Sequence, residues 1–231
     1  MVNNRLISEG AEVSATAVVC PRCQRQQVAG LVQVIRPDDE HLPRLFQGEL
    51  NRLSCAECGA DFMVPAPMLF RDDDERFLIY CLPLAEQAQW QDAERKMNEL
   101  TAAIFADSEL EEPPECRLTL TRRRFLEKIA IHLHGLDDRL IEYIKYQLYS
   151  RRDEPIDPVR SELFYDFSPG DSSTLAFILF DRESGEAQAA AHIPRELYEE
   201  LSAAFLTDGD LQQELEALFP GCYVSVERIL K

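Results

Sequence analysis

The sequence lacks any long apolar run, and no stretch approaches the roughly 18 consecutive apolar residues of a membrane-spanning helix. Residues 1–19 also lack the apolar core of a secretory signal peptide and carry Glu9 and Glu12. We therefore expect a cytoplasmic protein that does not enter a membrane. Its 231 residues suit one large domain or two small ones.

Basic residues are scarce: Lys and Arg number 24 against 42 Asp and Glu, for a net charge of -18. This imbalance argues against broad binding to nucleic-acid phosphates. The chain has one basic island, whose members are Arg122, Arg123, Arg124, Lys128, Arg151 and Arg152. We interpret the island as a solvated helix start. Arginine at a helix N-terminus interacts unfavourably with the helix dipole. The alternative is therefore that the island binds an acidic partner, such as the chain's own acidic linker.

The motifs of the commonest enzymes are also missing, since the sequence has no GxGxxG, P-loop, GxSxG or HExxH. His132 and His134 lie two positions apart on an expected helix and would point to different faces, which disfavours a shared metal ion. Asp137 and Asp138 fit a helix cap. Their alternative role is as acid and base together with the histidines.

Cysteine is the informative residue. Four of the seven cysteines form two CxxC pairs, CPRC at 20–23 and CAEC at 55–58. Two such turns, called knuckles, can place four thiolates around one metal ion. We predict one structural zinc ion bound by Cys20, Cys23, Cys55 and Cys58. Mononuclear iron, redox dithiols and an empty site are the alternatives. A closed four-thiolate set leaves no position for a reactive water and therefore stabilises a fold.

The residue after each pair also matters, because a knuckle often needs a positive φ there. Gly59 suits that position after the second pair, whereas Gln24 after the first pair is a departure. We interpret Cys81 as a small buried apolar residue. Cys116 and Cys222 are expected in or beside strands, with no assigned role.

Short β-like stretches surround both knuckles. The expected strands cover 15–19, 28–35, 53–55, 61–64, 65–70 and 76–83, with one short helix at 41–52. The acidic turn 71–75 joins the last two strands. It lacks the spacing of a calcium-binding loop, and we interpret it as a solvated turn.

The segment of about residues 15–83 resembles the bacterial and archaeal CpXC domain family. The resemblance rests on the CPxC pair, the Gly-Glu-Leu of the short helix, the CxxCG pair and the following PMLF…DDDERFLIYCLP. It implies a zinc-ribbon-like module whose ligands are Cys20, Cys23, Cys55 and Cys58. It implies no particular activity.

The remaining chain predicts a connecting region and a second domain. Residues 84–106 read as a helix with one apolar seam, formed by Trp90, Ala93, Met97, Leu100 and Ile104. We expect the seam to pack on its own chain, and homo-oligomerisation through this helix is the alternative. The acidic stretch 107–115 contains Pro113 and Pro114 and reads as a linker. The expected division is therefore 15–83, 84–115 and 116–231.

Residues 116–231 predict a mainly antiparallel sheet with packed helices, so the expected fold class is α+β. Strands are expected at 116–121, 161–167, 174–181, 187–193 and 222–230, and helices at 122–135, 136–152, 194–205 and 208–219. Gly135 can end the first of these helices, and Pro194 suits the first position of the third.

These observations favour a non-catalytic interaction, adaptor or regulatory protein with a protein partner. An enzyme or enzyme subunit is the first alternative, and it requires a pocket around His132, His134 or Asp138. A nucleic-acid-binding zinc ribbon is the second. The net negative charge of residues 1–83 disfavours it.

Overall fold

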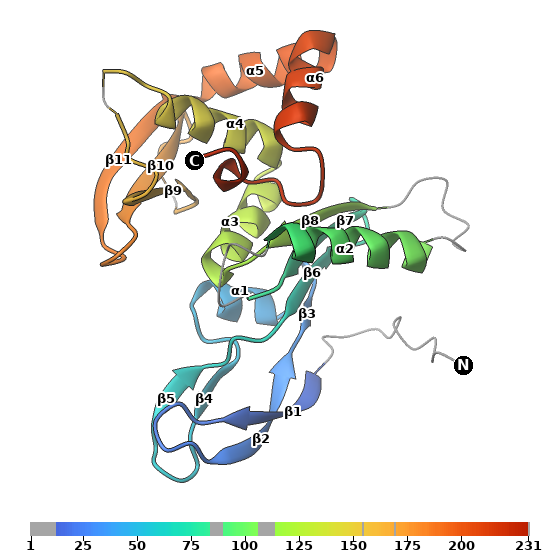
Figure 1. Cartoon of the computed structure of the whole chain (residues 1–231), viewed down its shortest axis with the longest axis vertical. Helices are drawn as coiled ribbons and strands as arrows, with labels where there is room; N and C mark the ends of the chain where they lie inside the picture. Colours follow the sequence, from blue (N-terminus) through green and yellow to red (C-terminus); the bar gives the residue numbers. More distant parts are fainter. Residues whose placement is uncertain (1–12, 84–89, 106–113, 154, 169, 231) are drawn as a thin grey trace.

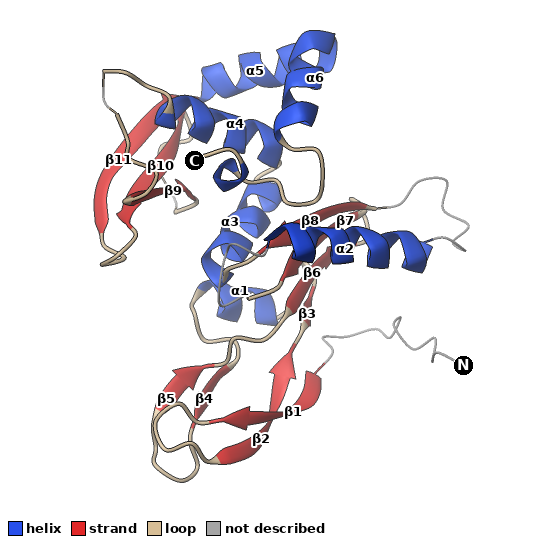
Figure 2. Cartoon of the chain, in the orientation of Figure 1, coloured by secondary structure: helices blue, strands red, loops and turns tan. Residues whose placement is uncertain are grey.

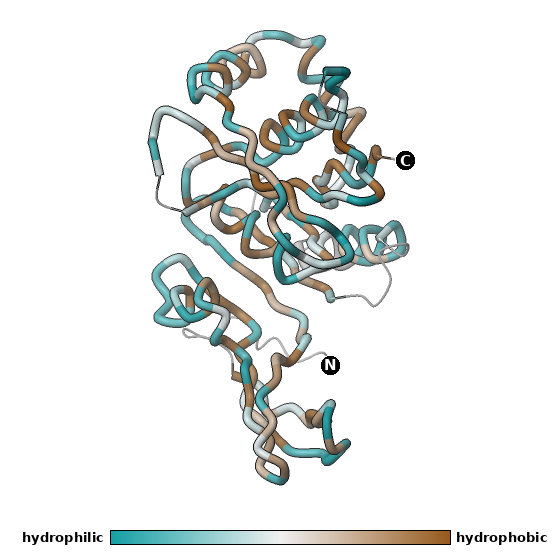
Figure 3. The backbone as a smooth tube through the Cα atoms, turned by 90° about the vertical axis from the view of Figure 1, so that its left-hand side faces the viewer, coloured by the Kyte–Doolittle hydropathy of each residue, from teal (hydrophilic) through white to brown (hydrophobic). Residues whose placement is uncertain are grey.

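The computed structural model describes residues 13–83, 90–105, 114–153, 155–168 and 170–230. The fold is mixed α+β, as predicted. Two views at right angles place the cysteine hairpins at one end of the long axis and the C-terminal helices at the other (Figures 1 and 3). Among the helices of these described residues, none has the length and apolar character needed to cross a bilayer.

Two antiparallel hairpins carry the cysteine pairs. The first consists of β1 (Val13–Val19) and β2 (Gln26–Val32), and the second of β4 (Arg52–Ser54) and β5 (Asp61–Met63). A small apolar cluster that includes Val18, Leu31 and Ala66 lies between them. Both hairpins match the predicted strands.

The short helix α1 (His41–Phe46) ends earlier than predicted. The chain turns at Gly48, with φ of 74°, and again at Asn51, with φ of 60°. The Asn51 side chain accepts from Val32 N at 2.9 Å and donates to Val32 O at 2.9 Å. The prediction of helix up to residue 52 is therefore wrong, because this segment is tied to the end of β2.

The central sheet joins segments far apart in the sequence. Its strands are β3 (Val34–Ile35), β6 (Met68–Asp72), β7 (Phe77–Cys81) and β8 (Glu115–Thr119), in the order β3-β6-β7-β8. β8 pairs in parallel with β7. The helix α3 (Arg122–Leu133) packs on this sheet through Phe125 and Ile129. The sheet thus runs across the expected boundary at 107–115, and the three-part division stays a prediction.

The helix α2 (Trp90–Phe105) lies beside β8 (Figure 1). Ala93 and Met97 are buried against Leu118, Leu120 and Tyr223. This part of the seam therefore packs on its own chain. Residues 84–89, the side chains of Leu100 and Ile104, and most of the expected linker lie outside the described residues.

The C-terminal part has a three-stranded antiparallel sheet in the order β11-β10-β9. Its strands are β9 (Ser161–Asp166), β10 (Thr174–Asp181) and β11 (Ala187–Pro194). The helices α4 (Asp138–Tyr149), α5 (Arg195–Thr207) and α6 (Gly209–Leu218) lie to one side of it (Figure 2). Pro194 is the last residue of β11 and the N-cap residue of α5. The helix therefore begins at Arg195, one residue later than predicted.

The predicted strands at 116–121 and 222–230 do not join this sheet. The first is β8 of the central sheet. The second is wrong, because the segment contains the short 3-10 helix η2 (Val226–Arg228). Carboxylates bind its backbone: Tyr223 N donates to Glu94 at 2.9 Å and Val226 N donates to Glu142 at 2.7 Å. These N–H groups are therefore not available to a strand ladder.

Candidate functional site

The two cysteine knuckles have the same local geometry. In the first, Cys20 N donates to Arg25 O at 2.9 Å and Gln24 N donates to Cys20 O at 3.0 Å. In the second, Cys55 N donates to Ala60 O at 2.9 Å and Gly59 N donates to Cys55 O at 2.9 Å. Each hairpin thereby presents its two cysteines from one tight turn.

The four thiols of these knuckles form a single cluster. All four sulfur atoms lie within 4.8 Å of one another. Cys20 Sγ lies 3.7 Å from Cys58 Sγ, and Cys23 Sγ lies 3.6 Å from Cys55 Sγ. A tetrahedral ion with metal–sulfur bonds of about 2.3 Å requires sulfurs about 3.8 Å apart. The residues present therefore fit one metal ion. Within the described residues, no other group of three or more His, Cys, Asp or Glu is gathered in this way.

Two of the four thiols have pKa values shifted in opposite directions. The backbone N–H groups of Cys58 and Glu57 lower the pKa of the Cys55 thiol to about 6. The backbone of Arg25 lowers the pKa of Cys23, but partial desolvation and the three neighbouring thiols outweigh it and raise that pKa to about 12. Adjacent sulfurs thus compete for negative charge, and a bound cation relieves that competition.

Gln27 on β2 links the two hairpins. Its side-chain amide donates to Ser54 O at 3.4 Å, and its Oε1 accepts from Ala56 N at 3.1 Å. This contact holds the first hairpin against the second knuckle. No sequence signal identified Gln27, because its partners lie on a separate hairpin.

Of the other three cysteines, Cys81 and Cys222 are buried and Cys116 is half-buried. Burial raises the pKa of Cys81 to about 11 and that of Cys222 to about 12. Burial also raises the pKa of Cys116. Thiols that stay protonated are poor nucleophiles. The interpretation of Cys81 as a buried apolar residue is confirmed, since its exposure is 0%.

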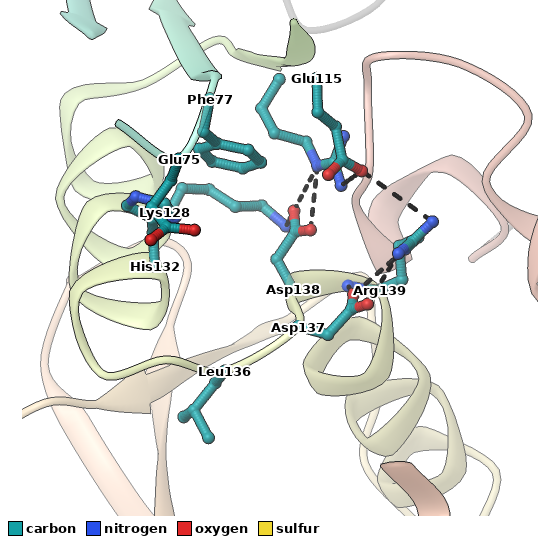
Figure 4. Close-up of a pocket in the computed structure, with 10 residues that line it drawn as sticks. Glu75, Phe77, Glu115, Lys128, His132, Leu136, Asp137, Asp138 and Arg139 are labelled. Atoms are coloured by element: carbon teal, nitrogen blue, oxygen red, sulfur yellow. Dashed lines mark hydrogen bonds and ion pairs between the residues drawn. The ribbon is translucent and has the colours of Figure 1, made fainter. Parts of the chain in front are cut away.

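A second feature is a polar pocket of about 180 Å³ between the central sheet and the α3–α4 turn (Figure 4). Its lining includes His132 and Asp138, together with Arg117, Lys128 and Phe77. The structure therefore brings together two of the three residues around which a catalytic site was considered. His134 is not in the lining, and its Nδ1 lies 2.9 Å from the Tyr165 hydroxyl.

The central charges of this pocket neutralise one another. Arg117 Nε donates to both oxygens of Asp138, at 2.9 and 2.8 Å, and Lys128 Nζ donates to Asp138 at 2.7 Å. Burial alone would raise the pKa of Asp138, but the two cations hold it well below its usual range. Asp138 is therefore a fixed anion and cannot carry a proton near neutral pH. Asp137 caps α4 by accepting from Arg139 N at 2.8 Å, as predicted.

His132 is held from two sides. Its Nε2 lies 2.8 Å from Asp72 Oδ2. Its ring stacks on Phe77, with centroids 4.5 Å apart and planes 5° from parallel. These contacts fix α3 to the turn between β6 and β7. They account for His132 as a packing residue.

The basic island is not a uniformly solvated helix start. Arg124 and Lys128 are buried, with 6% and 3% exposure, so that interpretation is wrong for both. Arg124 donates to Glu127 at 3.0 Å and to Glu162 at 2.6 Å. The acidic partners of Arg124 belong to α3 and β9. Those of Lys128, which are Asp138 and Glu142, belong to α4. The available signal was the three-residue spacing of Arg124 and Glu127, which places them on one helix face.

These residues belong to a larger buried ion cluster that joins β8, α3 and α4. Its members are Arg117, Arg124, Glu127, Lys128, Asp138, Glu142 and Lys145, and the Lys128–Glu142 pair at 3.5 Å joins its two halves. Lys145 is fully buried and donates to Glu127 at 2.6 Å and to Glu142 at 2.8 Å. The cluster couples the central sheet to the C-terminal part through paired charges.

The described residues define a mixed α+β protein with a four-cysteine cluster at one end. The CpXC protein family model matches residues 18–145, and the chain belongs to this family. The match contains all four cysteines and continues through α2, β8 and α3 into α4, beyond the resemblance seen at about 15–83. The comparisons with curated proteins and with solved structures give no match.

Proposed function

We propose that Cys20, Cys23, Cys55 and Cys58 bind one structural zinc ion. The sulfur separations of 3.6 and 3.7 Å, close to the edge of a tetrahedral zinc–thiolate site, are the observation that supports it. Zinc ties the β1–β2 hairpin to the β4–β5 hairpin. The apolar cluster between these hairpins is small, so the ion supplies much of their folding free energy.

Metal content tests this proposal directly. Protein purified without added metal should contain close to one equivalent of zinc per chain. Cys58→Ser should lower that content strongly, whereas Cys116→Ser should leave it unchanged, since Cys116 is a cysteine outside the cluster. Iron as the dominant metal, or folded metal-free protein with four titratable thiols, would contradict it.

We propose further that the zinc-stabilised hairpins serve as a non-catalytic interaction module in the reducing cytoplasm. An exposed apolar face on the first hairpin supports this role. Val13, Val19 and Val28 are 59%, 53% and 74% exposed. Ala15 and Ala17 alternate with the first two on the same face of β1. An uncharged face of this kind in a chain of net charge -18 suits an apolar protein partner.

A photo-crosslinking side chain at position 28 tests the interaction role in cells. We expect one discrete protein adduct from position 28. Position 159 is the matched control, because Val159 is also 74% exposed but lies outside the hairpins. Equal crosslinking from both positions, or none from position 28, would contradict the proposal.

The enzyme and nucleic-acid alternatives receive less support. The pocket at Asp138 has its central anion paired with two cations, which argues against proton transfer there. Two prominent cations of the basic island, Arg124 and Lys128, are buried and cannot reach phosphates. We therefore expect no salt-sensitive change in fluorescence anisotropy when the protein is titrated into labelled duplex DNA.

A further inference from the structure

A groove of about 400 Å³ lies between α4 and α5, at the end of the molecule opposite the cysteine hairpins. Its lining is mostly apolar and includes Tyr143, Ile144, Leu148, Ile193, Leu197 and Leu201. Leu197 is 51% exposed. An exposed leucine beside an open apolar groove gathers apolar surface in one place, which is typical of a contact surface.

The walls of this groove carry one charge of each sign. Arg151 follows the end of α4, and Glu200 lies on α5. Both residues are exposed. Within the described part of the chain, neither side chain takes part in an ion pair or side-chain hydrogen bond. The groove lining therefore combines apolar side chains with one unpaired arginine and one unpaired glutamate.

We infer that this groove is the face through which two copies of the chain form a two-fold dimer. In a two-fold interface each surface meets its own copy, so every contact occurs twice. Arg151 faces the partner's Glu200, and Glu200 faces the partner's Arg151. Leu197 of each copy enters the apolar groove of the other.

The charge pattern of the groove, unlike the net charge of the chain, favours a second copy as the occupant. A chain of net charge -18 repels its copy over most of its surface. The groove lining contains only one base and one acid among its charged residues, so two copies can meet there without like charges opposed. The seam of α2, by contrast, has Ala93 and Met97 covered by its own chain. The inference is independent of the zinc proposal and of the exposed face of β1–β2.

The oligomeric state of the full chain tests this inference. Sedimentation equilibrium of the zinc-loaded protein should show a monomer–dimer equilibrium. Leu197→Asp should abolish the dimer. Leu206→Asp should preserve it, because Leu206 is 76% exposed on the same helix but does not line the groove. A monomer at every concentration, or a dimer insensitive to Leu197→Asp, would overturn the inference.

A charge swap tests the predicted pairing. Arg151→Glu and Glu200→Arg should each raise the dimer Kd at least about tenfold, because each puts like charges together twice. The double variant should restore the Kd, because both pairs re-form with reversed polarity. A double variant whose dimer Kd is raised by as much as the two single changes combined would overturn the pairing. The zinc content of every sample is measured as well, and it shows whether a variant that does not dimerise still binds its metal.

Discussion

Gln24 and Gly59 occupy the same position in the two knuckles, and both have a left-handed backbone, with φ of 59° and 66°. Each residue follows the second cysteine of its pair and donates its N–H to the carbonyl of the first. The departure at Gln24 is therefore one of side chain and not of backbone. Glycine adopts this conformation freely, whereas a side chain there costs roughly 1 kcal/mol.

The knuckle geometry predicts opposite effects at these two positions. Gly59→Ala should destabilise the second knuckle by about 1 kcal/mol, and Gln24→Gly should stabilise the first by up to a similar amount. The chelator concentration that removes half of the zinc should fall for Gly59→Ala and rise for Gln24→Gly. Gly209→Ala is the control, because Gly209 lies in a helix with open space around it. An unchanged chelator midpoint in Gly59→Ala would contradict the prediction.

Zinc removal should loosen the hairpins and leave the rest of the chain folded. α1, β3, β6 and β7 share a core with Phe125 and Ile129 of α3 and do not depend on the cluster. A strong chelator should therefore speed hydrogen exchange in β1, β2, β4 and β5, while α3 and β9–β11 stay protected. The effect should stop near β3 and not extend to residue 83.

The Cys116→Ser variant, treated with the same chelator, provides the control for thiol loss outside the cluster. Equal loss of protection in α3 would show that the whole chain unfolds as one unit. No change in the hairpins would show that the metal is not structural. The two outcomes are separable because exchange is measured segment by segment.

The sequence predicted the features that depend on local spacing. The CxxC pairs identified the thiol cluster, and alternation of apolar residues identified most strands. The caps at Asp137 and Gly135 followed from residue type, and Gly135 has the expected positive φ of 66°. These features need only a few neighbouring residues, which is why a single sequence is enough to find them.

The features that were missed depend on distant partners. β8 pairs in parallel with β7 across the intervening α2, and no local pattern reports such a crossover. The final segment looked like a strand, but Glu94 and Glu142 bind its backbone from two helices. Burial of Arg124 depends on Glu162 of β9, which lies 38 residues further along the chain.

The buried ion cluster should be sensitive to loss of a single charge. Lys145→Met leaves the carboxylates of Glu127 and Glu142 without their shared ammonium group, at a cost of about 3–5 kcal/mol in the free energy of unfolding. Lys96→Met on the exposed surface of α2 should change this free energy by less than about 0.5 kcal/mol. Urea unfolding of both variants measures the difference. A loss for Lys145→Met no larger than that for Lys96→Met would contradict the prediction.

The paired state of Asp138 predicts a particular pH dependence of stability. Arg117 and Lys128 hold the pKa of Asp138 below its unfolded value of about 3.9, so its contribution is fully present above that pH. It is lost as pH falls through the lower folded pKa. Asp138→Asn should reduce stability at pH 7 by about 3 kcal/mol, because two buried cations lose the carboxylate that both of them contact. Its stability should also fall less steeply than wild type below about pH 4.

Asp74→Asn, in the exposed acidic turn, is the control and should follow the wild-type profile, including any loss of metal at low pH. Urea unfolding between pH 7 and pH 3 compares the three proteins. Parallel profiles for Asp138→Asn and wild type would show that Asp138 does not carry this dependence.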